Sequence, residues 1–183
     1  MKKLVVVLIL VTAFAVTYSH AIDDKWKATL KQNIDIVQAR DTKYIWGASG
    51  QELNGRLRVD CSGLIYYLFI QSGIPVKRTV ALRMRLGMDG WLGKDVELDD
   101  ADIYDVPFWS WKDQPTRPHG HVGILITGKK SGLIEAVHAS SSKGKVVAQP
   151  LQGVFIRDLS ATRHITIGEK QEPVLGKGVI KTK

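Results

Sequence analysis

The segment between Asp23 and Arg40 has a periodic pattern of hydrophobic residues. Apolar residues recur there every three or four positions, at Trp26, Leu30, Ile34 and Val37. This spacing is typical of an amphipathic α-helix with one buried face. The two aspartates at its start suit the positive end of a helix. After this helix the polar stretch 44–58, which contains several glycines, predicts a loop.

A second helix is predicted from Cys61 to Gly73. The segment is apolar around nearly its whole circumference, which indicates a helix buried on all sides. Asp60 is in the position of an N-cap residue, and Gly73 is a typical C-terminal stop. A shorter helix is predicted over residues 79–86.

After Asp100 the pattern changes to short apolar runs that predict β-strands. The expected strands are Val106–Trp111, Val122–Thr127, Leu133–Ala139, Lys145–Gln149 and a weaker one at Arg163–Ile167. The glycines in residues 128–132 predict a hairpin loop between the second and third of them. Helices followed by consecutive strands predict an α+β fold, with N-terminal helices packed on an antiparallel sheet.

The N-terminus has the pattern of a secretory signal peptide. Two lysines precede an apolar run from Leu4 to Val16, and a small-residue site ends at Ala21. A run of about 13 residues is short for a membrane span, although an uncleaved anchor is the alternative. We therefore predict a signal peptide at 1–21, one domain at 22–167 and a flexible basic tail at 168–183. The mature protein would be periplasmic or extracellular, without stable membrane insertion.

The net charge of +8 adds a preference for anionic partners such as cell-wall polymers. No compact block of basic residues interleaved with aromatics is present, so nucleic acid is not an expected partner. We expect a monomer.

The chain has one cysteine, Cys61, which has no partner for an intramolecular disulfide. It is an intermolecular bridge, a buried inert thiol or a reactive thiol. Its predicted place in the first turn of a helix favours reactivity, because the helix N-terminus lowers a thiol pKa. Backbone N–H groups there can also hold an oxyanion.

A reactive thiol needs a base, and three of the five histidines are candidates: His119, His121 and His138. If the hairpin loop is centred between Lys129 and Lys130, His121 and His138 lie directly opposite each other on one face. His138 could then orient His121, as the third member of a catalytic triad does. A register shift of one residue would separate them.

These residues resemble the motifs of the NlpC/P60 cysteine peptidases. The resemblance is carried by Asp60-Cys61-Ser62-Gly63-Leu64, by His121-Val-Gly-Ile124 and by Val137-His138-Ala-Ser140. Tyr44-Ile-Trp-Gly47 and Tyr104-Asp-Val-Pro-Phe-Trp109 resemble two further elements of the family.

The resemblance implies a papain-like α+β fold and hydrolysis of amide bonds in peptidoglycan stem peptides, with no cofactor and no metal. It implies that Cys61 is the nucleophile, His121 the base and His138 its orienting residue. Tyr44, Asp60 and Ser62 would contact the substrate or the oxyanion. The bond cleaved, D-Glu–diamino acid or D-Ala–diamino acid, stays open.

Two alternatives remain at the level of sequence. His119, His121 and His138 could form a three-histidine zinc site of a metal-dependent hydrolase. The basic charge and the tryptophans would also serve a non-catalytic cell-wall-binding module.

Overall fold

The computed structural model describes residues 26–128 and 132–165. The predicted signal peptide and basic tail lie outside these residues, as does the centre of the predicted 128–132 loop. No helix among the described residues has the length and apolar character that a membrane span requires.

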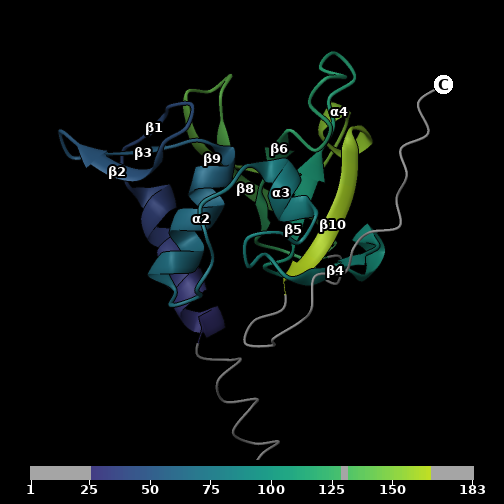
Figure 1. The fold of residues 1–183 in the computed structure, drawn as a ribbon, viewed down its shortest axis with the longest axis horizontal. Coiled ribbons are helices and arrows are strands. Elements are labelled where there is room, and N and C mark those ends of the chain that lie inside the picture. Colours follow the sequence, from purple (N-terminus) through teal and green to yellow (C-terminus); the bar gives the residue numbers. More distant parts are fainter. Residues whose placement is uncertain (1–25, 129–131, 166–183) are drawn as a thin grey trace, which may run out of the picture.

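Two long helices lie side by side on one flank of the molecule (Figure 1). The first, described over residues 26–39, buries Leu30, Ile34 and Val37, as the apolar spacing predicts. The second is α2 (Cys61–Gln71), in which Leu64, Ile65, Leu68 and Phe69 are all buried. Both helices contribute to the main core.

The start of α2 is set by Asp60. Its carboxylate accepts a hydrogen bond from the Gly63 N–H at 2.6 Å, which satisfies one of the free donors of the first turn. The helix ends before Gly73, whose φ of 78° is the left-handed conformation that glycine adopts without strain. The predicted cap and stop are therefore confirmed.

The strands form three small sheets. The first has the order β1-β3-β2, the second β4-β10-β5-β6 and the third β7-β8-β9. All pairs are antiparallel except β1 with β3. The strands are β1 (Thr42–Tyr44), β2 (Ser49–Leu53), β3 (Arg56–Val59), β4 (Gly93–Val96), β5 (Val106–Trp109), β6 (His121–Val122), β7 (Ile124–Leu125), β8 (Glu135–Ser140), β9 (Lys145–Pro150) and β10 (Leu159–Ile165).

Short helical elements connect these strands. They are α3 (Ala81–Arg85), the 3₁₀ turn η1 (Leu98–Asp100) and α4 (Val154–Arg157). The short helix predicted over 79–86 is thus present as α3. The α+β class is confirmed, with both long helices ahead of most of the sheet in the chain.

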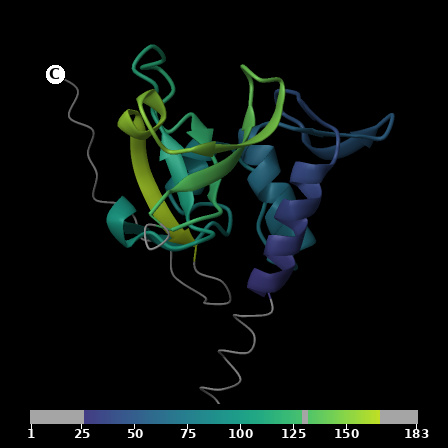
Figure 2. The same ribbon diagram turned by 180° about the vertical axis from the view of Figure 1, so that it is seen from behind.

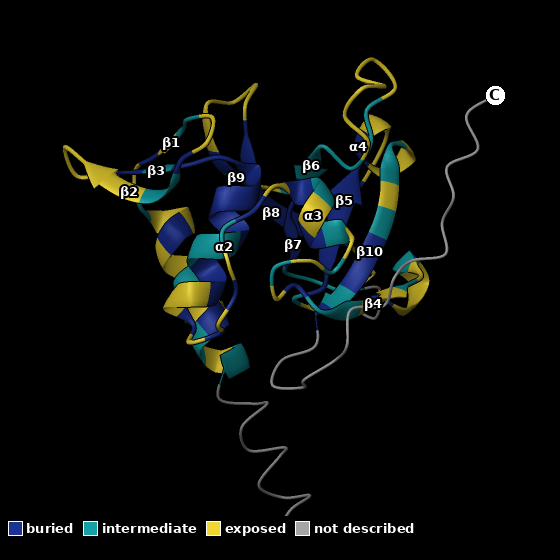
Figure 3. Ribbon diagram, viewed as in Figure 1, coloured by how far each residue is buried: buried dark blue, intermediate teal, exposed yellow. Residues whose placement is uncertain are grey.

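The prediction of a loop over residues 44–58 is wrong. Most of this stretch forms β2 and β3, which pair from Leu53 opposite Arg56 to Ser49 opposite Val59. The strand β2 is half or fully exposed along its length (Figure 3), so it shows no buried–exposed alternation in sequence. Its stability comes from backbone pairing with β3, which buries Leu57 and Val59.

The β8–β9 hairpin connects the helix-bearing flank to the remaining sheets. Figure 2 shows it reaching toward the sheet that contains β1. The Tyr44 N–H donates to the Gly144 carbonyl at 2.7 Å, and the Val146 N–H donates to the Thr42 hydroxyl at 3.0 Å. These bonds hold the hairpin in place beside the start of α2.

Candidate active site

Cys61 is the first residue of α2 and lies against β6. Its sulfur is 3.9 Å from the Gly120 carbonyl oxygen, and the backbone N–H groups of Ser62 and Val122 also contact it. Gly120 and Val122 are the two neighbours of His121 in the chain. The thiol therefore lies beside the backbone that carries the predicted base. Cys61 is 5 % exposed, so its thiol is covered.

A buried ion pair holds the turn that precedes Cys61. The guanidinium of Arg78 contacts both Asp60 carboxylate oxygens at 2.9 Å and the Ser62 hydroxyl at 2.9 Å. The same carboxylate accepts the N–H groups of Gly47 and Gly63. Asp60 and Ser62 thus fix the geometry of the helix start, and their contact with substrate stays a prediction. Arg78 was not identified from the sequence.

Gly63 allows the chain to pass very close to this turn. A Cβ atom at this position would lie 1.9 Å from the Ala48 carbonyl oxygen. Because that oxygen accepts the Asp60 N–H, the backbone segments around Ala48 and Gly63 are held together and cannot move apart. The third residue of the Cys-Ser-Gly motif is a glycine for this steric reason.

His121 in β6 and His138 in β8 form a hydrogen-bonded pair. The distance from His121 Nε2 to His138 Nδ1 is 2.9 Å. On its other side, His138 Nε2 lies 3.3 Å from Gln149 Oε1 in β9. The structure therefore joins the two histidines as predicted, and it adds Gln149, which sequence reasoning missed.

The predicted register of the histidine hairpin is wrong. Ile124 pairs with Val137 and Leu125 with Ala136, a register that places Gly123, not His121, beside His138. The displacement is two residues along the strand. Because side chains alternate with a period of two, such a shift keeps both rings on the same face.

Aromatic rings surround the histidine pair. Trp109 and Trp111 lie with ring centroids 5.4 and 5.9 Å from that of His121, and Phe155 lies 5.0 Å from His138. Trp109 is fully buried and is a packing residue. This cage restricts the orientations of both imidazoles.

Burial keeps the thiol and the imidazole uncharged at neutral pH. It raises the pKa of Cys61 to about 11, and the nearby Asp60 charge adds to this rise. It also lowers the pKa of His121 to about 3, with His138 as a smaller cause. The sequence-based expectation of a lowered thiol pKa is therefore wrong, since the loss of hydration outweighs the helix N-terminus and the two backbone donors.

The raised thiol pKa predicts the pH dependence of Cys61 alkylation. The thiolate fraction grows tenfold per pH unit below the pKa, so the iodoacetamide rate constant should rise about tenfold per unit from pH 7 to 10. Glutathione, a thiol of ordinary pKa, serves as the control and should level off near pH 9. A rate constant that is flat between pH 6 and 9 would instead show a preformed thiolate–imidazolium pair.

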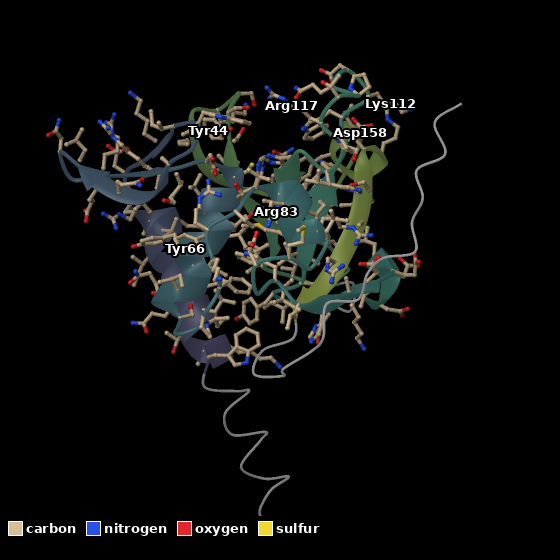
Figure 4. The ribbon with its side chains drawn as sticks, viewed as in Figure 1. Tyr44, Tyr66, Arg83, Lys112, Arg117 and Asp158 are labelled. Carbon is tan, nitrogen blue, oxygen red and sulfur yellow. The ribbon has the colours of Figure 1, made fainter. Side chains whose placement is uncertain are left out.

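Tyr44 ends β1 near the thiol. Burial raises the pKa of its phenol to about 12, and the Cys61 and Asp60 charges contribute further. The hydroxyl is consequently protonated at neutral pH and can donate a hydrogen bond. Figure 4 shows Tyr44 and Arg117 at the same end of the molecule, where Arg117 stacks over Trp46 at 5.0 Å.

A pocket of about 700 Å³ opens beside the histidine pair. Its lining includes both histidines and Gln149, flanked by the rings of Trp111 and Phe155. Charged residues of both signs stand around it: Lys112, Asp113, Arg157 and Asp158. Cys61 is absent from this lining and lies beneath the segment that precedes β6.

The structure does not support the three-histidine zinc site. The Nδ1 atom of His119 lies 2.7 Å from the Ser160 hydroxyl, whereas His121 and His138 are bonded to each other. Across residues 26–128 and 132–165, no group of three or more His, Cys, Asp or Glu side chains is arranged to hold a metal ion.

The protein is an α+β protein in which a cysteine at a buried helix start lies against a strand that carries a paired histidine. The sequence profile of the NlpC/P60 family matches residues 41–164. The chain belongs to the NlpC/P60 family.

One characterised relative is the gamma-D-glutamyl-L-lysine dipeptidyl-peptidase of Bacillus subtilis. It is 29% identical over 128 residues, which are 70% of this chain and 33% of the relative. The chain thus spans about a third of the length of that protein.

Solved structures of the family share the fold. An NLP/P60 family protein similar to lipoprotein from Staphylococcus aureus matches with a TM-score of 0.57 at 19% identity, over 78% of this chain and 42% of the other. The P60 domain of a Mycobacterium avium subspecies paratuberculosis antigen matches with a TM-score of 0.52 at 20% identity, over 83% and 99%. RipD of Mycobacterium tuberculosis, described as a non-catalytic NlpC/p60 protein adapted to peptidoglycan binding, matches with a TM-score of 0.50 at 15% identity, over 77% and 98%.

Proposed function

We propose that the chain is an exported cysteine peptidase that hydrolyses amide bonds in peptidoglycan stem peptides. The observation that carries the proposal is the placement of the Cys61 thiol against the backbone on both sides of His121, whose ring is bonded to His138. A nucleophile, a base and an orienting partner are the groups that amide hydrolysis by a thiol requires.

The reaction begins with proton transfer from the Cys61 thiol to Nδ1 of His121, the ring nitrogen that is not bonded to His138. The sulfur attacks the amide carbonyl, and the oxyanion is held by the Cys61 backbone N–H and the Tyr44 hydroxyl. His121 then gives its proton to the leaving amine, and a thioester with Cys61 remains. Water attacks the thioester and loses a proton to His121. That proton returns to the departing sulfur, which releases the new carboxylic acid.

The substrate must reach a thiol that is almost fully buried. The Gly120 carbonyl lies against the sulfur, and Arg117, whose carbonyl accepts the Gly120 N–H, contacts Trp46. We expect substrate to displace this segment before β6, which would bring the sulfur into the pocket beside the histidines. The name of the Bacillus subtilis relative makes the γ-D-glutamyl–diamino acid bond the first to test.

The test is hydrolysis of purified peptidoglycan by the full chain, with new amino groups counted and the fragments identified by mass spectrometry. Iodoacetamide should abolish amine release, whereas a strong chelator should leave it unchanged. Activity that survives iodoacetamide but is lost to the chelator would refute the thiol mechanism.

The second candidate is a wall-binding module without catalysis. The fold similarity to RipD, a protein described as non-catalytic, favours this function. The joint presence of Cys61, His121 and His138 favours catalysis, since binding requires none of them. Retention of the protein on insoluble peptidoglycan without release of amines would establish the binding module.

A further inference from the structure

Gln149 ends a chain of hydrogen bonds that leads away from the thiol. The chain runs from His121 Nε2 to His138 Nδ1 at 2.9 Å, and from His138 Nε2 to Gln149 Oε1 at 3.3 Å. Gln149 lies in β9 opposite Ala136, two residues from His138 in β8. Alternating side chains place it on the same face as His138.

Only two proton arrangements satisfy this chain when both imidazoles are neutral. A neutral imidazole has one N–H donor and one acceptor nitrogen, so each bond in the chain contains a single proton. In the first arrangement His138 Nε2–H donates to the Gln149 oxygen, and His121 Nε2–H donates to His138 Nδ1. In the second, the Gln149 NH₂ group donates to His138 Nε2, and His138 Nδ1–H donates to His121 Nε2. The proton of His121 is then on Nδ1.

The two arrangements differ at the atom that matters for catalysis. The first leaves Nδ1 of His121 as an unprotonated acceptor, free to take the proton of Cys61. The second puts a proton on that nitrogen, which is then unable to act as a base. The Gln149 atom that lies 3.3 Å from His138 Nε2 is the carbonyl oxygen, which is the acceptor that the first arrangement requires.

Burial keeps both rings in the neutral form to which this argument applies. The pKa of His121 is lowered by burial, and the pKa of His138 is lowered for the same reason. The bond to Gln149 acts in the opposite sense on His138, as an oxygen acceptor does.

We propose that Gln149 is a positioning residue whose carbonyl oxygen holds the proton of His138 on Nε2 and thereby keeps Nδ1 of His121 unprotonated. The catalytic consequence rests on the proposed function. When His121 receives the Cys61 proton on Nδ1, its Nε2–H bond to His138 remains, and no proton moves along the chain. The uncharged amide of Gln149 thus orients His138, a role that a carboxylate has in many other catalytic sites.

The protonation pattern can be read without any turnover. The full chain with Cys61→Ala, labelled with ¹⁵N-histidine, should show NMR shifts typical of a protonated Nε2 on both His121 and His138 and of an unprotonated Nδ1 on both. Adding Gln149→Leu should convert these shifts into a mixture of tautomers. Adding Gln149→Glu, which restores an acceptor and no donor, should return the original pattern.

Activity supplies the second readout. In the protein with Cys61 intact, Gln149→Leu should lower kcat about tenfold with little change in KM, the factor that one hydrogen bond of ordinary strength carries. Gln149→Glu should recover most of this loss and move the acidic limb of the kcat profile to higher pH, because an anion favours protonated imidazole. Gln152→Leu is the matched control: it is exposed, near the same pocket, and should leave kcat unchanged.

Two results would overturn the proposal. One is a proton on Nδ1 of His121 in the resting protein. The other is an unchanged His138 tautomer in a folded Gln149→Leu variant, with folding verified by thermal melting. Because the NMR experiment needs no substrate, it decides the role of Gln149 even if the protein releases no amines from peptidoglycan. Failure of the peptidase assay alone would count against the proposed function instead.

Discussion

Replacement of Cys61 by serine is expected to lower amine release from peptidoglycan by at least about a thousandfold, as loss of a catalytic nucleophile does. A serine hydroxyl is a much weaker acid than a thiol, and His121 is a weak base in this buried site. The side chain is almost the same size, and the helix start is held by Asp60 and Arg78, so the fold should be unaffected.

The controls separate loss of chemistry from loss of structure. The Cys61→Ser variant should melt within a few degrees of the parent and bind insoluble peptidoglycan equally well. His121→Ala should be similarly inactive. His138→Ala should retain more activity, because His138 acts only by orienting His121. Amine release by Cys61→Ser at the parental rate would remove the thiol from the mechanism.

Replacement of Arg78 by methionine should lower the free energy of unfolding more than any other substitution proposed for this protein. It leaves the Asp60 carboxylate, whose side chain is 8% exposed, without its cation. Removing one partner of a buried ion pair costs about 3–5 kcal/mol. Because the Arg78 side chain is itself 26% exposed, we expect the lower end of this range, about 3 kcal/mol in the free energy of unfolding.

A second arginine of the same region provides a matched control. Arg83 pairs with Asp89 at the surface, with side-chain exposures of 46% and 25%. Its replacement by methionine should lower the free energy of unfolding far less than replacement of Arg78, because an exposed ion pair contributes little to stability. Urea unfolding of both variants measures the difference. Adding Asp60→Asn to the Arg78→Met variant should recover part of the lost stability, whereas adding it to the Arg83→Met variant should not. Equal effects of the two arginine substitutions would contradict a structural role for the buried pair.

The parts of the fold that follow from local rules were predictable from sequence. Helix α2 is predictable because its residues are apolar on all sides and lie between a capping aspartate and a glycine. Its observed end lies within two residues of the expected one. The strands β8 and β9 were likewise located within two residues at each end. In these segments the hydrophobic pattern and the end signals agree.

The parts that depend on distant contacts were not predictable. Arg78 and Asp60 are 18 residues apart, and only the folded turn reveals that they meet. Gln149 was assigned to a strand, yet its contact with His138 depends on the β8–β9 register, which alternation alone leaves open. The histidine pair was anticipated in spite of a wrong register, because a shift of two residues preserves the face.

The two ends of the described domain leave it at nearly the same place. Trp26 at the start of the first helix and Ile165 at the end of β10 line one small cavity. Figure 1 shows both ends on the lower edge, whereas Tyr44 and Arg117 mark the opposite edge in Figure 4. A unit with neighbouring ends can be inserted into a surface loop of a host protein with little distortion of either partner. The geometry therefore suits recombination into larger architectures, since flanking modules would join on the edge opposite the proposed active site.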